Sequence, residues 1–237
     1  MRSADTAAVL VAGGTGARFG RSSGKQLALL AGRPVLAYSF DACANALRVG
    51  LVVVVCHPDR VREYAEALQT GESGVEVRFV AGGSRRQDSV AAGLSQIPEE
   101  FEYVAVHDGA RPLAGSALFD VALDALDSEP DLAGAVIGHP AVDTLKLVEK
   151  GRVASTPDRS RFWAVQTPQV FRAVALRSAY AEAAKTGREG TDDASLVEAT
   201  GGSVRVLEGP RDNIKVTLAE DLAVAEALLA TRAEGGG

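Results

Sequence analysis

The chain has 237 residues, of which 46% are hydrophobic and 24% are charged, and its formal net charge at pH 7 is -6. This length and composition allow one substantial hydrophobic core, and the acidic balance argues against a general nucleic-acid-binding protein. The longest strongly apolar run, residues 49–56, is too short to span a bilayer, and no separate apolar region with a cleavage site occurs at the N-terminus. We therefore expect a soluble, cytoplasmic protein without a membrane or nucleic-acid partner.

Short β-rich runs alternate with helical patterns up to residue 138. Such alternation is typical of an α/β fold with a mostly parallel sheet and helices on both faces, in which ligands bind beyond the C-terminal ends of the strands. The expected strands are residues 7–12, 49–56, 75–80, 103–107 and 133–138, and the expected helices are residues 35–46, 59–69, 87–96 and 116–126.

The pattern changes from about residue 140 to residue 172. Two short β-rich runs flank Glu149, Lys150 and Gly151, which predicts a hairpin in place of another helix–strand unit. We interpret the segment of about 140–172 as a β-arm that projects from a single domain spanning residues 1–232. The tail, residues 233–237, is expected to be disordered. The remaining expected elements are helices at 173–184, 192–199 and 219–231 and a strand at 203–207.

The most informative segment is a buried-type strand that runs into a glycine-rich turn followed by two cations, Arg18 and Lys25. Glycines let backbone N–H groups approach an anion closely, and the cations supply charge that backbone dipoles alone cannot. This pattern predicts a phosphate-binding loop, with a simple glycine turn after an edge strand as the alternative. The small residues of the turn are Ala12, Gly13, Gly14, Thr15 and Gly16.

The spacing of this loop excludes two familiar phosphate-binding motifs. A P-loop needs four residues between its first glycine and Gly-Lys-Ser/Thr, but only three separate Gly20 from Gly24, and Gln26 has no hydroxyl for magnesium. The dinucleotide-binding fingerprint fails at Phe19, where it requires glycine or alanine. The loop therefore fits neither an ordinary kinase or ATPase nor a typical NAD site.

A second loop with similar chemistry follows the strand expected at residues 75–80. Gly83, Ser84 and Ser89 lie at the start of the next expected helix, where anions are favoured. A second nucleotide contact is therefore expected here. The alternative is that Ser84 or Asp88 only caps the helix and that the two intervening arginines, 85 and 86, are solvated.

The strand expected at residues 103–107 is followed directly by Asp108, with Arg111 three residues later. A carboxylate at a strand end is well placed to hold Mg²⁺, directly or through water, because magnesium usually takes one or two carboxylates together with phosphate oxygens. Asp108 is therefore the candidate metal ligand. A structural turn or an ion pair between Asp108 and Arg111 is the alternative.

Three later groups of polar residues interrupt apolar, strand-like surroundings. Thr144 precedes the expected hairpin, Arg159 and Thr167 follow it, and Lys215 lies before the last helix. Each residue alone is compatible with turn chemistry or a solvated charge. If they meet in space, they predict a shared anionic substrate.

In this order, the motifs resemble those of the 2-C-methyl-D-erythritol 4-phosphate cytidylyltransferase family of the non-mevalonate isoprenoid pathway. The resemblance covers about residues 9–228. It implies a nucleotide-binding fold of the glycosyltransferase-A kind, a homodimer joined through projecting arms, and Mg²⁺-dependent transfer of a cytidylyl group from CTP to the methylerythritol phosphate, with release of pyrophosphate. The motifs occupy residues 12–18, 25–26, 83–90, 107–112, 143–146, 167–169, 191–195 and 213–217.

The resemblance also implies roles for individual residues. It assigns catalytic roles near the phosphates to Arg18, Lys25 and Lys215. It assigns the metal to Asp108, and it implies that two arm residues of the substrate site reach across the dimer. The implied nucleotide-binding residues are Ala12, Gly13, Gly14, Thr15, Gly16, Gly83, Ser84, Ser89 and Asp108. The implied methylerythritol phosphate-binding residues are Arg111, Thr144, Arg159 and Thr167, of which Thr144 and Arg159 are those of the arm.

Other functions are compatible with the same residues. A D-ribitol 5-phosphate cytidylyltransferase would share the nucleotide loops and differ in the acceptor pocket. A broader alternative is a nucleotidyltransferase that uses another nucleotide and a sugar 1-phosphate. A non-catalytic nucleotide sensor is a third alternative, although a sensor does not need every charge around the transferred phosphoryl group.

Overall fold

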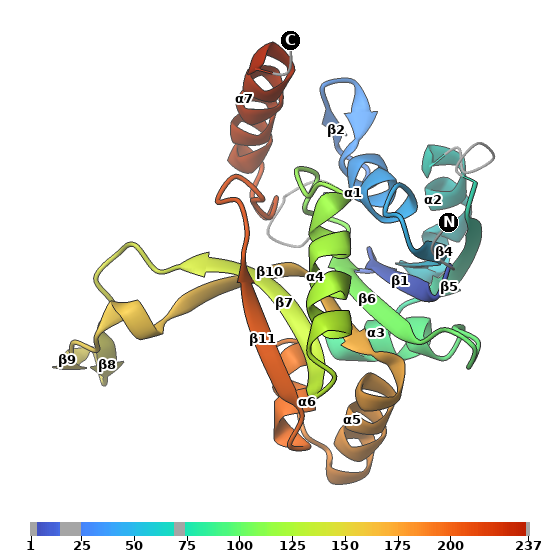
Figure 1. Ribbon diagram of the computed structural model, residues 1–237. Coiled ribbons are helices and arrows are strands. Elements are labelled where there is room, and N and C mark those ends of the chain that lie inside the picture. Colours follow the sequence, from blue (N-terminus) through green and yellow to red (C-terminus); the bar gives the residue numbers. More distant parts are fainter. Residues whose placement is uncertain (1–3, 15–24, 69–73, 236–237) are drawn as a thin grey trace.

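The structure is a computed structural model that describes residues 4–14, 25–68 and 74–235. Within these residues the centre is a seven-stranded sheet (Figure 1), in the order β11-β7-β10-β6-β1-β4-β5. Every neighbouring pair is parallel except the two pairs that β10 forms with β6 and β7. The expected mostly parallel α/β sheet is confirmed. Its strands are β1 (Thr6–Val11), β4 (Val49–Cys56), β5 (Glu76–Ala81), β6 (Tyr103–Asp108), β7 (Leu132–Pro140), β10 (Trp163–Arg172) and β11 (Ser203–Glu208).

The central strands are apolar on both faces because both faces are covered. Side chains of β1 alternate between two cores, with Ala8 and Leu10 in one and Ala7 and Val9 in the other. All residues of β4 from 51 to 56 are fully buried. A near-continuous apolar run is what a parallel strand between two helical layers requires.

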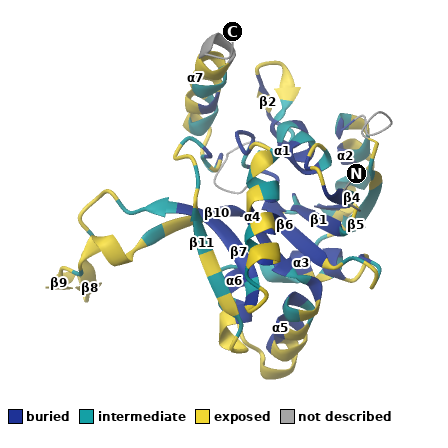
Figure 2. Cartoon of the chain, in the orientation of Figure 1, coloured by how far each residue is buried: buried dark blue, intermediate teal, exposed yellow. Residues whose placement is uncertain are grey.

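Helices cover both faces of the sheet, as expected. Figure 2 shows the strands between the two layers as mainly buried, whereas the outer surfaces of the helices are exposed. On the face of Ala8 and Leu10 lie α1 (Val35–Ala44), α2 (Val61–Leu68) and α4 (Ala117–Ser128). On the opposite face lie α3 (Arg86–Leu94), α5 (Ala173–Thr186) and α6 (Asp193–Ala199).

A smaller third core joins the C-terminal helix to a short hairpin. The helix α7 (Glu220–Gly235) packs against β2 (Leu29–Leu30), which pairs with β3 (Arg33–Pro34). The buried Val216 belongs to this core, and its backbone N–H donates to the carbonyl of Ala110 at 2.8 Å. The segment that precedes α7 is thereby fixed beside the end of β6.

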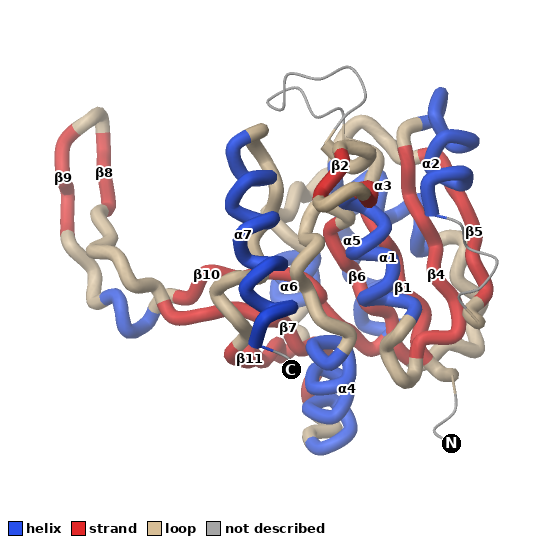
Figure 3. Tube along the Cα trace, turned by 90° about the horizontal axis from the view of Figure 1, so that it is seen from above, coloured by secondary structure: helices blue, strands red, loops and turns tan. Residues whose placement is uncertain are grey.

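The hairpin expected around residue 150 is confirmed and projects away from the sheet (Figure 3). It consists of β8 (Leu147–Glu149) and β9 (Arg152–Ser155), and a 3₁₀ turn follows at Arg159–Arg161. The turn residues Lys150 and Gly151 both have positive φ, 48° and 77°, as a tight two-residue hairpin turn requires.

The expected arm of about 140–172 is too long at its C-terminal end. Residues 163–172 form β10, which lies between β7 and β6 and is buried from Gln166 to Phe171. The projecting part is therefore residues 141–162. Pro168 in the middle of β10 obscured the strand in the sequence, because proline lacks a backbone N–H for the ladder.

The C-terminal segment also differs from the expectation of a disordered tail at 233–237. The helix α7 continues to Gly235, and residues 236–237 lie outside the described part of the chain. None of the helices in the described residues combines the length and the apolar character needed to cross a membrane.

Close packing between β7 and β10 yields a prediction about stability. A Cβ atom on Gly134 would lie 2.4 Å from Cδ1 of the fully buried Phe171. We expect Gly134→Ala to lower the free energy of unfolding by about 1–3 kcal/mol, because the ring cannot move away within a packed core. Urea unfolding measures this change. Gly115→Ala is the control, since a Cβ there meets no atom within 4 Å; equal midpoints for the two variants would contradict the prediction.

Candidate active site

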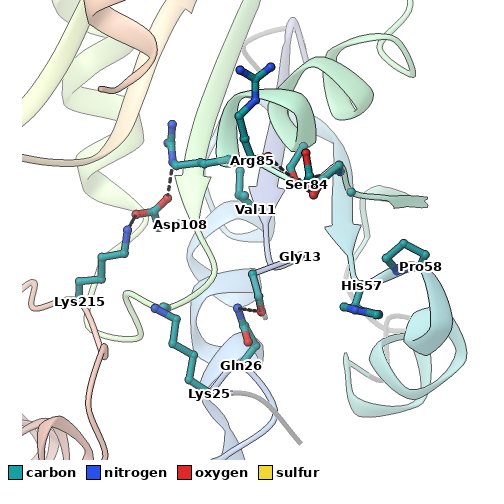
Figure 4. Close-up of a pocket in the computed structure, with 16 residues that line it drawn as sticks. Val11, Gly13, Lys25, Gln26, His57, Pro58, Ser84, Arg85, Asp108 and Lys215 are labelled. Atoms are coloured by element: carbon teal, nitrogen blue, oxygen red, sulfur yellow. Dashed lines mark hydrogen bonds and ion pairs between the residues drawn. The ribbon is translucent and has the colours of Figure 1, made fainter. Parts of the chain in front are cut away.

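A cleft of about 630 Å³ opens where the parallel strands β1, β4, β5 and β6 end (Figure 4). Asp108 and Lys215 lie at one side of the cleft, whereas His57 and Pro58 lie at the other. Its lining residues are Val11, Gly13, Gly14, Lys25, Gln26, His57, Pro58, Gly82, Gly83, Ser84, Arg85, Arg86, Ser89, Asp108, Ala110 and Lys215. The glycine-rich loops and the cations expected at the strand ends are thus brought together.

The first glycine-rich segment continues β1 into the cleft. Ala12 is buried, and its backbone N–H donates to the carbonyl of Val55 at 2.7 Å. Gly13 and Gly14 line the cleft, and the amide of Gln26 donates to the carbonyl of Gly14 at 3.4 Å. Lys25 also lines the cleft. Three residues expected here, Thr15, Gly16 and Arg18, lie outside the described part of the chain.

The second loop is held in shape by side chains at the start of α3. The hydroxyl of Ser89 accepts a hydrogen bond from the backbone N–H of Gly83 at 3.2 Å. The carboxylate of Asp88 accepts from the hydroxyl of Ser84 at 3.1 Å and from the backbone N–H of Arg85 at 3.2 Å. The capping alternative for Asp88 is therefore confirmed. Gly83, Ser84 and Ser89 also line the cleft, so the cap and the expected nucleotide-binding position occur together.

Asp108 is the centre of a cluster of charges. Its Oδ2 accepts from Nζ of Lys215 at 2.5 Å (Figure 4), and its Oδ1 accepts from Nε of Arg86 at 3.1 Å. The Asp108 side chain is only 9% exposed. Burial raises the pKa of this carboxyl, but the charges of Arg86 and Lys215 outweigh burial and hold the pKa well below its usual range. Asp108 is therefore an ionised carboxylate with a cation on each oxygen.

The backbone of Asp108 is held in place by a buried pair of side chains, one on β10 and one on β6. Its N–H donates to the hydroxyl of Thr167 at 3.0 Å, and this hydroxyl also forms a hydrogen bond with Nδ1 of His107, at 3.0 Å. Burial lowers the pKa of His107 to about 3, which keeps the imidazole neutral. Thr167, expected to bind substrate, is 4% exposed and acts here as a support for Asp108.

Lys215 is positioned by the segment that connects β11 to α7. The buried Asn213 donates to Oε1 of Gln166 and to the carbonyl of Thr167, each at 3.0 Å. Arg111 donates to the carbonyl of Asn213 at 2.7 Å. Arg111 thus lies beside the cleft and fastens the segment that carries Lys215.

Two residues expected in the substrate site are remote from the cleft within one chain. Thr144 and Arg159 are exposed on the arm, and Arg159 donates to the carbonyl of Val142 at 2.6 Å. The single chain therefore does not bring these two residues to Asp108.

The sequence interpretation missed two residues that border the site. The sequence places Arg86 among the cations of the second loop, with a solvated charge as the alternative, and assigns it no role of its own; in the structure it bridges Asp108 and Asp193, with its Nη2 donating to Asp193 at 2.8 Å. Asp193 is fully buried. The start of a helix after a glycine loop indicated a functional position for Arg86, whereas nothing local indicated its partner 107 residues away.

The donors in the cleft are compatible with a metal ion that is held largely by its substrate. No group of three or more His, Cys, Asp or Glu residues suited to a metal occurs among the described residues. Asp108 is the single carboxylate among the cleft residues the structure describes. One carboxylate together with substrate phosphates and water is an ordinary magnesium environment.

Comparisons with known proteins identify the family of the chain. The family model of IspD, 2-C-methyl-D-erythritol 4-phosphate cytidylyltransferase, matches residues 6–231. A protein of this name from Prochlorococcus marinus (strain MIT 9313) is 43% identical over 228 residues, which cover 95% of this chain and 98% of the relative. Another from Alkaliphilus metalliredigens (strain QYMF) is 39% identical over 96% of this chain and 94% of the relative.

Solved structures show the same likeness. The 4-diphosphocytidyl-2C-methyl-D-erythritol synthase from Anaerococcus prevotii superposes with a TM-score of 0.83 at 27% identity, covering 95% of this chain and 98% of the other. The 2-C-methyl-D-erythritol 4-phosphate cytidylyltransferase from Thermus thermophilus gives a TM-score of 0.74 at 32% identity, covering 94% and 98%. With a family match over nearly the whole sequence and relatives of this identity, the chain belongs to the 2-C-methyl-D-erythritol 4-phosphate cytidylyltransferase family.

Proposed function

We propose that the protein transfers the cytidylyl group of CTP to 2-C-methyl-D-erythritol 4-phosphate, forming 4-diphosphocytidyl-2-C-methyl-D-erythritol and pyrophosphate. The observation that carries this proposal is the pairing of Asp108 with Arg86 and Lys215 at the strand ends, in a cleft that Lys25 also lines, in a chain of the named family. The chain as a whole is acidic, with a net charge of -6, so binding of an anionic nucleotide depends on local cations such as those of this cleft.

The reaction needs positioning and charge more than a base. The attacking phosphate oxygen of the substrate is already anionic; it forms a bond to the α-phosphorus of CTP, and the bond from that phosphorus to pyrophosphate breaks. The buried, neutral His107 supports Asp108 and takes no proton from the nucleophile. Lys25 and Lys215 offset the charge of the phosphates as it shifts toward the leaving group.

We assign the nucleotide to the cleft and Mg²⁺ to Asp108. A volume of about 630 Å³ is within the usual range for a small-molecule site. Asp108 would hold the ion directly if Lys215 leaves Oδ2, or through water if it stays. Bound Mg²⁺ would supply positive charge to the triphosphate, in addition to that of the lysines.

We also propose that the functional unit is a homodimer joined through the arms. A two-stranded hairpin is marginally stable alone, and large apolar side chains on this arm are exposed. Leu147 and Val148 are each 54% exposed, and Val153 is 61% exposed. A second copy that covers these side chains would stabilise the hairpin and would bring Thr144 and Arg159 to the partner's cleft.

The test of the proposed function is pyrophosphate release from CTP in the presence of Mg²⁺. We expect release with 2-C-methyl-D-erythritol 4-phosphate and little with D-ribitol 5-phosphate under the same conditions. Preference for the ribitol phosphate would leave the proposed cytidylyl transfer unchanged but would identify ribitol phosphate as the acceptor. If the protein binds CTP but releases no pyrophosphate from it with either acceptor, it is a nucleotide sensor and the proposal is refuted.

Two lysines of the cleft provide a prediction about catalysis. We expect Lys25→Ala and Lys215→Ala each to lower kcat at least about tenfold, equivalent to roughly 1.4 kcal/mol of barrier, because each removes charge from the transferring phosphates. Steady-state kinetics with CTP and the methylerythritol phosphate measure this effect. Lys185→Ala, an exposed position on α5, is the control. Near-normal turnover in both cleft variants would remove these lysines from the mechanism.

A mixing experiment tests whether the arm acts in the partner's site. We expect Arg159→Ala and Lys215→Ala each to be nearly inactive, and a refolded equimolar mixture to recover about a quarter of the wild-type activity. In half of such dimers, one cleft would combine an intact Lys215 with an intact Arg159 from the other copy. A monomeric mass in solution, or no recovery on mixing, would contradict the shared site.

A further inference from the structure

A buried carboxylate beside the cleft has no role in the reaction as proposed and does not cap a helix. Asp193 is the first residue of α6 and is 0% exposed. The cap of this helix is the preceding residue, Asp192, whose carboxylate accepts from the backbone N–H of Ser195 at 2.9 Å. The start of α6 therefore has its capping carboxylate without Asp193. The reason for burying the charge of Asp193 as well must lie in its contacts with other elements.

Both oxygens of Asp193 are used by side chains from other elements. Its Oδ1 accepts from the hydroxyl of Tyr180 on α5 at 2.5 Å, and its Oδ2 accepts from Nη2 of Arg86 on α3 at 2.8 Å. Tyr180 is itself only 8% exposed. A buried carboxylate is tolerated when its oxygens are paired in this way, and the pairing holds the carboxylate in one orientation.

Arg86 transmits that orientation to the cleft. Its Nη2 contacts Asp193 while its Nε contacts Asp108 at 3.1 Å. A guanidinium is a rigid planar fork, so fixing one edge fixes the direction of the other. The second cation on Asp108, Lys215, is a point charge on a flexible stem, and its side chain is 39% exposed.

We propose that Tyr180 and Asp193 are positioning residues that hold Arg86 in the orientation in which it fixes the carboxylate of Asp108. This inference rests on the proposed function, which gives Asp108 its role in nucleotide transfer. When Lys215 turns from Asp108 to a substrate phosphate, the Tyr180–Asp193–Arg86 chain keeps Asp108 paired and aimed into the cleft.

The experiment compares two buried tyrosines that both donate to an aspartate. Tyr180→Phe removes the hydroxyl that orients Asp193. Tyr103→Phe is the matched control, because Tyr103 is 3% exposed and donates to Asp127 at 2.9 Å, at the end of β6 opposite Asp108. We expect both variants to lower Tm, but only Tyr180→Phe to lower kcat, by about tenfold, with the KM for CTP changed less than about threefold.

A second variant tests the transmission through Arg86. Arg86→Lys keeps the positive charge but cannot contact both carboxylates with a rigid fork, so we expect kcat to fall by about tenfold or more. Adding Tyr180→Phe to Arg86→Lys should then lower kcat by less than about twofold further, because both substitutions interrupt the same chain. Calorimetric titration with CTP shows in parallel whether each variant retains its nucleotide site.

The outcomes separate the two proposals. Equal kcat in the two tyrosine variants, or fully multiplicative effects in the double variant, would overturn the positioning role while wild-type turnover upholds the proposed function. Wild-type kcat in Arg86→Lys would overturn it as well, even if Tyr180→Phe fails to fold. Absence of turnover in the wild type would instead refute the proposed function and this inference with it.

Discussion

Asp108 carries a charge in a place that water scarcely reaches, and much of the site is arranged around that constraint. An isolated carboxylate would become neutral on burial, yet the pKa of Asp108 lies well below its usual range because Arg86 and Lys215 contact its two oxygens. These cations come from α3 and from the segment before α7, elements far apart in the sequence. The ionised state of Asp108 and the docking of these elements therefore depend on each other.

The direction of β10 determines that the cleft and the arm share one edge of the sheet. The parallel strands β6 and β7 end at the edge where ligands bind, and β10 runs against both of them. It therefore enters the sheet at that edge, where Thr167 meets Asp108. The excursion from Pro140 to Trp163 must leave from the same edge. An arm on this connection is well placed to carry residues to the cleft of another copy, as the proposed dimer requires.

The elements predicted best from the sequence were those that depend on local apolar patterns. The strand expected at 49–56 coincides with β4, because a valine-rich run of this length has few other stable environments. The strand β10 was missed because Pro168 interrupts its pattern; the structure accommodates the proline where the register with β7 shifts between Val165 and Gln169.

In the candidate site, too, local patterns were predictable from the sequence, whereas contacts between distant residues were not. The loops that line the cleft were predictable, since glycines and cations that follow a strand together are typical of an anion-binding turn. The pair of Arg86 and Asp193 was not, because it joins residues 107 positions apart and neither shows a local signal for the other. Contacts of this kind arise when the fold brings α3 and α6 to the same face of the sheet, and they become visible only when the fold is known.

The cations of the cleft differ in how firmly they are held, and this difference matters for phosphate transfer. Arg86 contacts two carboxylates, one of them fully buried, so releasing it would leave Asp193 without this ionic partner. Lys215 contacts the carboxylate of Asp108 and is 39% exposed. An ammonium on a flexible stem can exchange a carboxylate for a phosphate oxygen at low cost, whereas a rigid guanidinium with a buried anchor cannot. With Arg86 fixed, Lys215 can therefore follow the shifting charge of the reaction without leaving a buried carboxylate unpaired.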